Sequence, residues 1–486
     1  MNASISDIQT LLNGTAQLHM MGIGGAGMRG LARILSNEGH HVTGCDTKPE
    51  KAREIQQKHD IETLAGHDPS HLTAEELEQP DLLIHSAAVP ETTDERQRAQ
   101  EIELPQASYS RGLAALFNHQ NGIAVAGTHG KTTCTAMLSI VLEASGFDPS
   151  CLVGGVVQEW GTSSRVGDGP HFVAEACEFG ENFEAMCPRH ILLTNVDRAH
   201  LDYYDHAEAV EEAFARFLSR QEALGFLVCE RNSDAVSRVC EHAVANVQRI
   251  SPDGEDEWWL RSNRESGRRT FTVQSNGDQS PELPVPIRGK HQVMNAAQVA
   301  VLARLLGAEW THIRDGLDAF AGVHRRFEVH RDGSDGGPVV IDDYGHHPEE
   351  IQRTISAVQE SYPERHVVVC FQPHQFSRTY HFRDEWAGAL SGADEIWLAP
   401  IYEARDTEQQ QDRISIDDIA ENVRDIHDQS FTVSGPEHAG ERMAQKAEEH
   451  HVFLTIGAGD IWKAVEEFND RYTSDMTDQN VVDTSH

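Results

Sequence analysis

Short apolar runs alternate along the chain with longer stretches in which apolar residues recur at helical spacing. The runs predict buried strands, and the stretches, such as residues 28–37 and 293–306, predict helices that cover them. Strands and helices in this order form parallel sheets with right-handed crossovers, so the pattern predicts an α/β fold. The predicted strands cover residues 18–23, 41–46, 81–86, 171–176, 191–196, 226–230, 339–342, 367–371, 395–398 and 452–456.

The order of these elements divides the chain into three α/β segments. We predict that the segments cover residues 1–118, 119–327 and 328–474. Residues 251–288 are polar and rich in Gly, Pro and Asp, which predicts a hairpin excursion from the second segment. Residues 475–486 are polar and are predicted to form a disordered tail.

Composition limits the classes of function. The 486 residues carry a formal net charge of −38, which argues against nucleic acid or an anionic membrane as partner. The excess of acidic residues indicates either adaptation to a salty cytoplasm or an ordinary soluble, self-repelling surface. Eight scattered cysteines without a Cys-x-x-Cys pair predict reduced thiols in a cytoplasmic protein, rather than disulfides or a zinc site. Residues 1–19 lack the pattern of a signal peptide, and no apolar run is long enough to span a bilayer.

The most informative motif follows an apolar run that ends at residue 126. It consists of Gly127, Thr128, His129, Gly130, Lys131, Thr132 and Thr133. Such a turn directs backbone N–H groups and the positive end of a helix dipole at phosphate. Lys131 can then reach the β- and γ-phosphates, and the Thr132 hydroxyl can bind Mg²⁺. Val125 replaces the first glycine of the usual pattern, and the alternative is a glycine turn followed by a surface lysine. We predict that the chain uses ATP or a related nucleotide.

A second glycine-rich turn lies between the first predicted strand and the first predicted helix. It contains Gly22, Gly24, Gly25 and Gly27, and Asp46 ends the next predicted strand. In dinucleotide-binding folds this arrangement binds a pyrophosphate and a ribose hydroxyl. The turn therefore predicts a diphosphate site, which suits a UDP group as well as NAD. The alternative is tight strand–helix packing without a ligand.

Polar side chains gather at the ends of further predicted strands. Glu175 and Glu178 end one strand, Asn195 and Asp197 end the next, and His200 follows. Because parallel strands end at the same edge, Glu175 and His200 could complete a Mg²⁺ site with Thr132. The alternative is a solvated carboxylate and a capping histidine.

The third segment has two polar clusters of its own. Residues 342–348 and 371–378 follow predicted strands and supply His, Tyr and Arg side chains. They predict a site for a small carboxylate or amine, with a hydrogen-bonded turn network as the alternative. Residues 325–328, between the second and third segments, could bring an Arg onto ATP phosphates.

Taken together, these motifs resemble the Mur ligase family over residues 15–470. The resemblance is carried by residues 22–27, 127–133, 175–178, 195–197, 200–204, 290–291, 295, 325–328, 342–348, 371–379 and 457–460. It implies a Rossmann-like N-terminal domain for a UDP sugar, a central ATP-binding domain with a mostly parallel sheet, and a Rossmann-like C-terminal domain for an amino acid. It also implies Mg²⁺ (or Mn²⁺) as cofactor, and a monomer or weak homodimer. Within the family, the motifs are most similar to those of the branch that joins L-alanine to the lactyl carboxylate of UDP-N-acetylmuramate in peptidoglycan precursor synthesis, through an acyl phosphate.

The resemblance also implies roles for single residues. The implied catalytic residues are Lys131, Glu175, His200, His347 and Arg378. The implied nucleotide contacts are residues 127–133, Asn295 on the adenine and Arg326 on a phosphate. The implied UDP-sugar contacts are Gly22, Gly24, Gly25, Gly27, Asp46 and Ser86. The implied amino-acid contacts are Tyr344, His347, Gln375 and Arg378. The implied metal ligands are Thr132, Glu175 and His200.

The chain departs from the family pattern at several positions, among them Gln292, near the adenine contact, and Ala199, in place of an acid before His200. Gln375 stands where relatives usually carry an arginine for the amino-acid carboxylate. No lysine occurs between Lys131 and Lys290, so the carbamylated lysine of several Mur ligases cannot operate from that stretch. The nearest alternative function is that of a murein tripeptide ligase, although Tyr344 and Gly345 favour the alanine branch. An NAD-dependent oxidoreductase or a non-catalytic UDP-sugar sensor would leave Lys131 unexplained.

Overall fold

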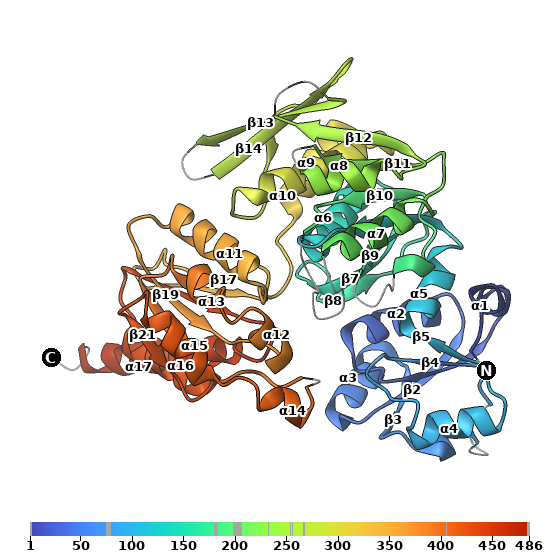
Figure 1. Ribbon diagram of the computed structural model, residues 1–486, viewed down its shortest axis with the longest axis horizontal. Coiled ribbons are helices and arrows are strands. Elements are labelled where there is room, and N and C mark those ends of the chain that lie inside the picture. Colours follow the sequence, from blue (N-terminus) through green and yellow to red (C-terminus); the bar gives the residue numbers. More distant parts are fainter. Residues whose placement is uncertain are drawn as a thin grey trace. The chain divides into compact units, whose positions relative to one another are not determined.

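The computed structural model describes residues 2–73, 79–178, 183–197, 207–231, 233–252, 254, 256–265, 268–404 and 406–483. The chain divides into two compact units. One comprises Met1–Asn263, Thr270–Pro286 and Met294–Val323, and the other comprises Arg264–Arg269, Ile287–Val293 and His324–His486. The α/β class predicted from the sequence is confirmed, because helices connect mostly parallel strands throughout (Figure 1).

The N-terminal sheet has five parallel strands in the order β3-β2-β1-β4-β5. Its strands are β1 (Gln17–Met21), β2 (His41–Asp46), β3 (Glu62–Ala65), β4 (Leu82–His85) and β5 (Gln106–Ser108). The helices are α1 (Ile5–Leu12), α2 (Ala26–Asn37), α3 (Pro49–His59), the 3₁₀ helix η1 (Pro69–Leu72), α4 (Asp94–Glu101) and α5 (Tyr109–Phe117). The strand order reverses at β1, so the glycine-rich turn after β1 lies at the point where such sheets bind ligands.

The central sheet has eleven strands, in the order β15-β14-β13-β12-β11-β10-β6-β9-β7-β8 with β16 paired to β14. Its strands are β6 (Asn121–Ala126), β7 (Ser150–Val157), β8 (Thr162–Arg165), β9 (His171–Ala176), β10 (His190–Leu193), β11 (Phe226–Glu230), β12 (Asn246–Ser251), β13 (Trp258–Glu265), β14 (Arg268–Ser275), β15 (Asp278–Gln279) and β16 (Leu283–Pro284). The helices are α6 (Lys131–Ala144), α7 (Ala207–Leu218), α8 (Asp234–Cys240), α9 (His291–Leu305) and α10 (Trp310–Ala319).

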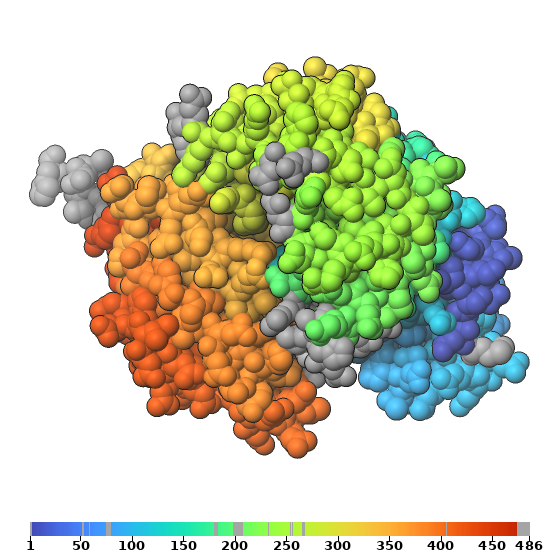
Figure 2. All heavy atoms as spheres, turned by 45° about the horizontal axis from the view of Figure 1, so that its top comes forward, coloured from blue at the N-terminus to red at the C-terminus, as the bar shows by residue number. Residues whose placement is uncertain are grey.

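The stretch that we predicted as a hairpin excursion contains strands β13 to β16. The pairs β14–β15 and β14–β16 are antiparallel, whereas β6 pairs in parallel with both β9 and β10. The surface of this stretch is drawn in yellow-green in Figure 2. This polar stretch therefore lies at an edge of the sheet, whereas the phosphate loop follows β6, a strand in the parallel centre.

The C-terminal sheet has six strands in the order β17-β18-β22-β19-β20-β21, and β17 alone among them pairs antiparallel. Its strands are β17 (Glu328–Asp332), β18 (Val339–Asp343), β19 (His366–Phe371), β20 (Glu395–Leu398), β21 (Ser430–Thr432) and β22 (His451–Ile456). The helices are α11 (Pro348–Ser361), α12 (Phe376–His381), α13 (Trp386–Leu390), α14 (Glu408–Gln411), α15 (Ile416–Arg424), α16 (Pro436–Gln445) and α17 (Lys463–Asp483).

The C-terminal end differs from the prediction of a disordered tail over residues 475–486. Helix α17 continues to Asp483, and residues 484–486 lie outside the described part of the chain. No Gly or Pro occurs between Lys463 and Asp483, so nothing in the backbone chemistry interrupts the helix. Among the described residues, no helix has both the length and the apolar character needed to cross a membrane.

Helix α2 contacts the central strands β7 and β8. The Arg33 guanidinium donates to the Ser164 carbonyl at 2.7 Å, and the Ser163 hydroxyl donates to the Ala26 carbonyl at 3.2 Å. A Cβ atom built on Gly30 would lie 2.3 Å from Leu152 Cδ1, so α2 approaches β7 most closely at a position that has no side chain. These contacts join the helix that carries the glycine-rich turn to the central sheet.

Phe117 provides a test of how the core supports this sheet. Its ring is fully buried at the end of α5, 5.9 Å from the Phe172 ring of β9. Phe117→Ala should lower the free energy of unfolding by about 3–5 kcal/mol, because the cavity cannot close between a helix and a strand. Urea unfolding followed by circular dichroism measures the loss. Leu224→Ala, at a side chain that is 84% exposed, is the control and should change stability by less than about 0.5 kcal/mol.

Candidate active site

The glycine-rich turn after β1 is held by the end of β2. The amides of Gly22 and Ile23 donate to the Cys45 carbonyl at 2.8 and 3.1 Å, and the Gly24 amide donates to Asp46 Oδ2 at 2.9 Å. The other Asp46 carboxylate oxygen accepts the Lys48 amide at 2.9 Å. The Asp46 carboxylate therefore holds the turn by accepting one of its backbone amides. The predicted contact of Asp46 with a ribose hydroxyl stays a prediction.

The other predicted UDP-sugar residues meet at the same edge of the sheet. Gly22 has φ +75°, and a Cβ atom there would lie 3.0 Å from Ser86 Cβ, beyond the end of β4. A Cβ on Gly27 would lie 2.8 Å from the Tyr109 hydroxyl oxygen. Helix α2 begins after Gly25 without a side-chain cap. The structure thus brings the glycines, Asp46 and Ser86 together around a helix N-terminus.

The phosphate loop joins β6 to α6 and is locked by the segment after β10. The His129 amide donates to Asn195 Oδ1 at 2.9 Å, and the Asn195 side-chain amide donates back to the His129 carbonyl at 3.0 Å. The Thr128 hydroxyl accepts the Asp197 amide at 2.9 Å. Gly127 and Gly130 have φ of +130° and +83°, conformations that L side chains rarely adopt. The loop is therefore rigidly held by the neighbouring parallel strand's end.

Lys131 is the first residue of α6, and its amine is turned into the loop. Nζ donates to the carbonyls of Gly127 (2.5 Å) and Thr128 (3.0 Å), and it lies 2.9 Å from Glu178 Oε2. The Glu178 carboxylate is fully buried. Burial alone would lower the pKa of the Lys131 amine, but the Glu178 carboxylate together with Cys177 and Glu175 outweighs burial, so the pKa lies above its ordinary value. The ammonium therefore stays charged at the mouth of the loop.

Glu175, the predicted metal ligand, and Glu178 of the same motif have different surroundings. The Glu175 carboxylate accepts the Gly154 amide at 2.5 Å, and a Cβ atom on Gly154 would lie 2.7 Å from that carboxylate. Glu178, three residues later, pairs with Lys131 instead. The structure thus places Glu178, and not Glu175, against the phosphate-loop lysine. His200 lies outside the described residues.

Asn295 of α9 lies beside the phosphate loop. A Cβ atom built on Gly130 would lie 3.2 Å from Asn295 Nδ2, and the Asn295 side chain is almost fully buried. Its neighbour Gln298 donates to the Leu193 carbonyl of β10 at 2.9 Å, which fixes the helix against the sheet. The predicted contact of Asn295 with adenine stays a prediction.

In the second unit, the turn just before β17 carries the predicted arginines. Arg325 is tied to its own domain, since Nε lies 3.0 Å from Asp342 Oδ2 and Nη1 donates to the Gly459 carbonyl at 2.9 Å. The Arg326 guanidinium lies over the Tyr344 ring, 4.7 Å from its centre. Arg326 is thus the arginine without that anchor, and its predicted contact with a nucleotide phosphate stays a prediction.

Asp343, at the end of β18, joins the turn before β17 to the turn after β18 from a buried position. One oxygen accepts the Gly345 amide and the other accepts the Phe327 amide, both at 2.8 Å. Burial raises the pKa of the Asp343 carboxyl to about 6, against the opposing effect of Arg326. Burial also lowers the pKa of His346 to about 3, so that imidazole is neutral at pH 7.

A row of rings and cations connects the ends of β18 and β19. The His346 ring lies 5.5 Å from the Tyr344 ring and 6.4 Å from the His374 ring, and Arg378 Nη1 lies 3.3 Å from His374 Nδ1. His374 also stacks on Tyr402 with ring centres 5.6 Å apart. The structure therefore brings Tyr344 and Arg378 into one cluster, with His346 and His374 between them.

The other two predicted amino-acid contacts stand at helix starts. His347 caps α11 by accepting the Glu349 amide at 3.4 Å, and its ring packs 4.6 Å from the Phe382 ring. Gln375 precedes α12 with φ +67°, and its amide donates to the Tyr402 carbonyl at 2.9 Å. Both are partly exposed, and their contact with an amino acid stays a prediction.

Comparison with known proteins agrees with this geometry. Three family models match consecutive parts of the chain: the Mur ligase family catalytic domain at residues 17–121, the Mur ligase middle domain at 125–303 and the Mur ligase glutamate ligase domain at 325–459. The chain belongs to the Mur ligase family. The family resemblance inferred from the motifs is thereby confirmed.

Similar proteins are found among both sequences and structures. A UDP-N-acetylmuramate–L-alanine ligase of Caldanaerobacter subterraneus subsp. tengcongensis is 33% identical over 457 residues, which cover 93% of this Mur ligase and 97% of that protein. The crystal structure of the UDP-N-acetylmuramate–alanine ligase MurC from Thermotoga maritima matches with a TM-score of 0.78 and 26% identity, over 95% of this chain and all of that one. A murein peptide ligase from Psychrobacter arcticus 273-4 matches with a TM-score of 0.69 and 22% identity, over 94% and 99% of the two chains, and shows the shared fold.

Family membership decides between the alternatives left open by the motifs. The glycine-rich turn of β1 belongs to a ligase domain, so it does not indicate an NAD-dependent oxidoreductase. The phosphate loop lies at the start of the matched middle domain, so Lys131 is not a surface lysine after a glycine turn. The family is one of ATP-dependent ligases, which agrees with the predicted use of ATP.

Three residues of the site were not singled out as contacts by sequence reasoning. They are Glu178, His346 and His374, each of which lies in a motif that the sequence analysis named. The sequence pattern does not show which of several adjacent residues in these motifs faces the site. The motifs lie just past strand ends, where the two-residue alternation of a strand no longer tells which side chain turns inward.

Gly127 tests the backbone of the phosphate loop. A Cβ atom at this position would lie 2.1 Å from Thr194 Oγ1 in addition to requiring φ +130°. Gly127→Ala should therefore displace the loop and weaken ATP binding at least about tenfold, as isothermal titration calorimetry would measure. Gly146→Ala is the matched control, because Gly146 also has a positive φ but nothing within 4 Å of its added Cβ. An unchanged ATP affinity in Gly127→Ala would contradict the fixed loop.

Asp343 should give stability a characteristic pH dependence. Its pKa is about 6 in the folded protein against 3.8 as the ordinary value, so the folded state holds more protons between these pH values. Stability from this group is therefore fully present below about pH 4 and is lost as the pH rises through about 6. As the pH rises from about 4 to about 6, the Tm of the wild type should fall relative to that of Asp343→Asn. A difference that is constant from pH 4 to 7 would contradict the raised pKa.

Proposed function

We propose that this Mur ligase joins L-alanine to the lactyl carboxylate of UDP-N-acetylmuramate, with ATP converted to ADP and phosphate, in the synthesis of peptidoglycan precursors. The observation that carries the proposal is the charged, partly buried Lys131 at a phosphate loop in a chain of this family. The similarity to UDP-N-acetylmuramate–L-alanine ligases over nearly the whole chain supports the choice of substrates.

The reaction needs activation because a carboxylate and an amine do not condense in water at neutral pH. A lactyl carboxylate oxygen attacks the γ-phosphorus of ATP, the bond to the β,γ-bridging oxygen breaks, and ADP leaves. The alanine amine then attacks the acyl phosphate carbonyl, loses a proton, and inorganic phosphate leaves. The protein contributes mainly positioning and charge stabilisation, as in other phosphoryl transfers.

The phosphate loop would bind the triphosphate of ATP. Helix α6 begins after Gly130 without a side-chain cap, so its first amides are directed to the loop. The Lys131 ammonium lies among them, and an incoming phosphate would compete with Glu178 for its charge. Its place beside the loop's own carbonyls keeps it within reach of the transferred group.

The residues beside the loop fit a Mg²⁺ site. Thr132 lies in the first turn of α6, and Glu175 and Glu178 lie at or just after the end of the adjacent β9. A hydroxyl and carboxylates are the hard oxygen ligands that Mg²⁺ prefers. Thr132 and Glu175 would hold the ion together with the predicted His200, and Glu178, which pairs with Lys131, is a further candidate. When bound, the ion supplies positive charge to the phosphates.

The ring-and-cation row in the C-terminal domain would bind the amino acid. The first amides of α12, at Phe376 and Ser377, already donate to the Asp406 carboxylate at 2.9 and 3.0 Å. The amino-acid carboxylate would therefore be met by the Arg378 guanidinium rather than by this helix terminus. Gln375 adds a neutral donor at most, while Tyr344 and His347 limit the side chain that fits.

The remaining assignments complete the proposal. Gly22, Gly24, Gly25, Gly27, Asp46 and Ser86 would form the UDP-sugar site at the N-terminus of α2. The domains would be residues 1–118, 119–327 and 328–474. The protein would be a cytoplasmic monomer or weak homodimer, with neither nucleic acid nor a membrane as partner, in keeping with its net charge of −38.

Phosphate release with UDP-N-acetylmuramate and ATP tests the proposal across a panel of amino acids. L-Alanine should give the highest kcat/KM, and the tripeptide L-Ala-γ-D-Glu-meso-diaminopimelate should be a poor substrate. Hydroxylamine in place of alanine should yield a hydroxamate of the UDP sugar, because it traps the acyl phosphate. Preference for the tripeptide would assign the chain to recycling, and release without a requirement for the UDP sugar would overturn the ligase proposal.

Lys131→Ala should lower kcat by about 10²–10³, since it removes a charged donor from the transferring phosphoryl group. Glu178→Gln should lose more activity than Glu175→Gln, because only Glu178 contacts that lysine. Lys463→Ala is the matched control, as its amine pairs with Asp460 on a half-exposed helix start. Activity of Lys131→Ala equal to that of this control would contradict the phosphate-loop mechanism.

A further inference from the structure

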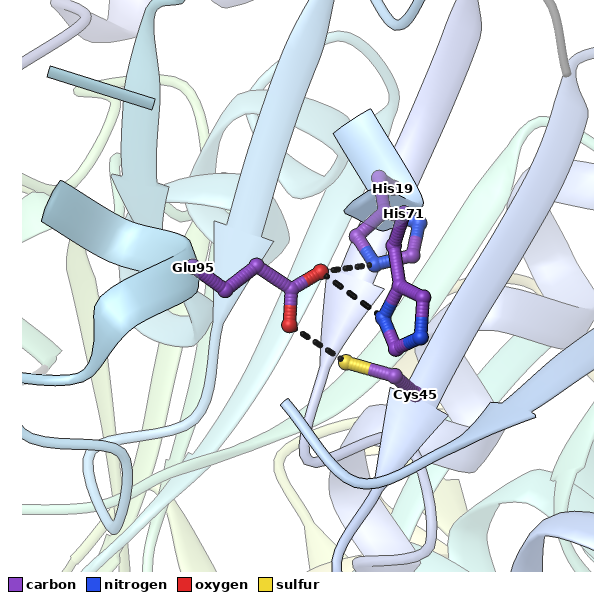
Figure 3. A group of neighbouring side chains, drawn as sticks. All are labelled: His19, Cys45, His71 and Glu95. Atoms are coloured by element: carbon purple, nitrogen blue, oxygen red, sulfur yellow. Dashed lines mark hydrogen bonds and ion pairs between the residues drawn. The ribbon is translucent and has the colours of Figure 1, made fainter. Parts of the chain in front are cut away.

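A cluster of metal-ligand side chains lies in the N-terminal domain, apart from the sites described above. It consists of His19 on β1, Cys45 on β2, His71 on η1 and Glu95 on α4, and Figure 3 shows their polar atoms directed at one another. The candidate ligand atoms all lie within 4.8 Å of one another. His19, Cys45 and Glu95 are buried, and His71 is 11% exposed. None of these residues has a part in the ligase reaction.

The side chains of the cluster lie close enough to share one ion. Glu95 Oε1 lies 2.9 Å from His19 Nε2 and 3.2 Å from His71 Nδ1, and Glu95 Oε2 lies 3.2 Å from Cys45 Sγ. Tetrahedral Zn²⁺, with bonds of roughly 2.0–2.3 Å, places neighbouring ligand atoms about 3.3–3.8 Å apart. The cluster therefore needs only a small expansion to accept such an ion.

The charge of Glu95 is not balanced by a permanent cation. In the part of the chain that the structure describes, its ion-pair partners are His19, His67 and His71, with no Lys or Arg. Glu95 lies in the first turn of α4 and is fully buried. A buried carboxyl group among two imidazoles and a thiol is a place where a metal cation can be held.

His19 is oriented to present Nε2 as a ligand. Its Nδ1 lies 2.8 Å from the Thr43 hydroxyl oxygen, a second partner that holds the ring with Nε2 toward Glu95. Within the described residues, Nε2 makes no hydrogen bond of acceptable angle, although Glu95 Oε1 is 2.9 Å away. A second partner that fixes the tautomer is typical of metal-bound histidine.

We propose that His19, Cys45, His71 and Glu95 bind a Zn²⁺ ion. Two imidazoles, a thiolate and a carboxylate form a donor set that suits zinc, whereas Mg²⁺ prefers oxygen ligands alone. Four protein ligands leave no open position, so the site is structural. The partly exposed His71 and His67 lie on the side from which the ion enters. The scattered cysteines predicted reduced thiols rather than a zinc site. The four ligands come from four separate elements, so no short motif in the sequence reveals them.

The zinc site would stabilise the end of β2, which holds the glycine-rich turn of the UDP-sugar site. Cys45 ligates through its side chain, while its carbonyl accepts the Gly22 and Ile23 amides. The next residue, Asp46, accepts the Gly24 amide. Zinc would thereby tie η1 and α4 to the two strands that hold the glycine-rich turn.

Metal content and spectroscopy of the full-length protein test the proposal without reference to activity. After chelation and titration with Zn²⁺ in excess Mg²⁺, one zinc per chain should remain through gel filtration. Co²⁺ in its place should give the visible bands of a tetrahedral site and a thiolate charge-transfer band in the near ultraviolet. Cys45→Ser should lose that band, whereas Cys370→Ser, at another buried strand cysteine, should keep it.

Two further variants separate metal binding from mere folding. Thr43→Val removes only the partner of His19 Nδ1 and should weaken zinc affinity about 10–100-fold. His71→Ala should abolish the rise in Tm that zinc produces, and His41→Ala, at an exposed histidine of the same sheet, should retain it. Failure of wild type to retain zinc, or a cobalt spectrum unchanged by Cys45→Ser, would overturn the proposal.

Discussion

The geometry of parallel strands is the constraint on which every candidate site of this Mur ligase depends. Each crossover returns the chain to the same edge, so residues remote in sequence meet where strands end. The glycine-rich turn and Asp46 meet at the ends of β1 and β2, and Lys131 meets Glu178 after β6 and β9. The same rule brings His346 beside His374 after β18 and β19. The antiparallel pairs that β14 makes with β15 and β16 lie at an edge of the central sheet, away from the phosphate loop.

Within that frame, the Lys131–Glu178 pair sets the electrostatics of the phosphate loop. A buried carboxylate keeps the ammonium charged, and the loop carbonyls hold it at one place. The pairing is strong enough to fix the lysine but does not enclose it, since the Lys131 side chain is still 13% exposed. An anion that approaches the loop therefore meets a preformed positive charge, which limits the reorganisation needed during phosphoryl transfer.

Sequence patterns predicted the buried centre of the fold better than its periphery. The predicted strands at residues 41–46, 171–176, 226–230 and 395–398 coincide with β2, β9, β11 and β20, because apolar runs there end abruptly at polar residues. Short edge strands such as β3 and β5 carry too few apolar residues to stand out. The continuation of α17 was missed because its last turns lack the apolar stripe on which helix prediction depends. Among site residues, the loop glycines and Lys131 were identified from local chemistry alone. The pairing of Lys131 with Glu178, and the group around Glu95, required tertiary structure, since they depend on which side chains turn toward one another.

The strongly acidic composition and the anionic substrates of this family are compatible because the two act over different distances. The net charge of −38 is spread over a surface where salt screens interactions beyond about 10 Å. Both predicted anion sites lie instead at helix starts, after Gly25 and Gly130, where no side chain caps the first amides. Backbone dipoles in these turns act within a few ångströms of a bound phosphate, and Lys131 adds a full charge at one of them. Local donors therefore decide binding, and the surface carboxylates are free to serve solubility.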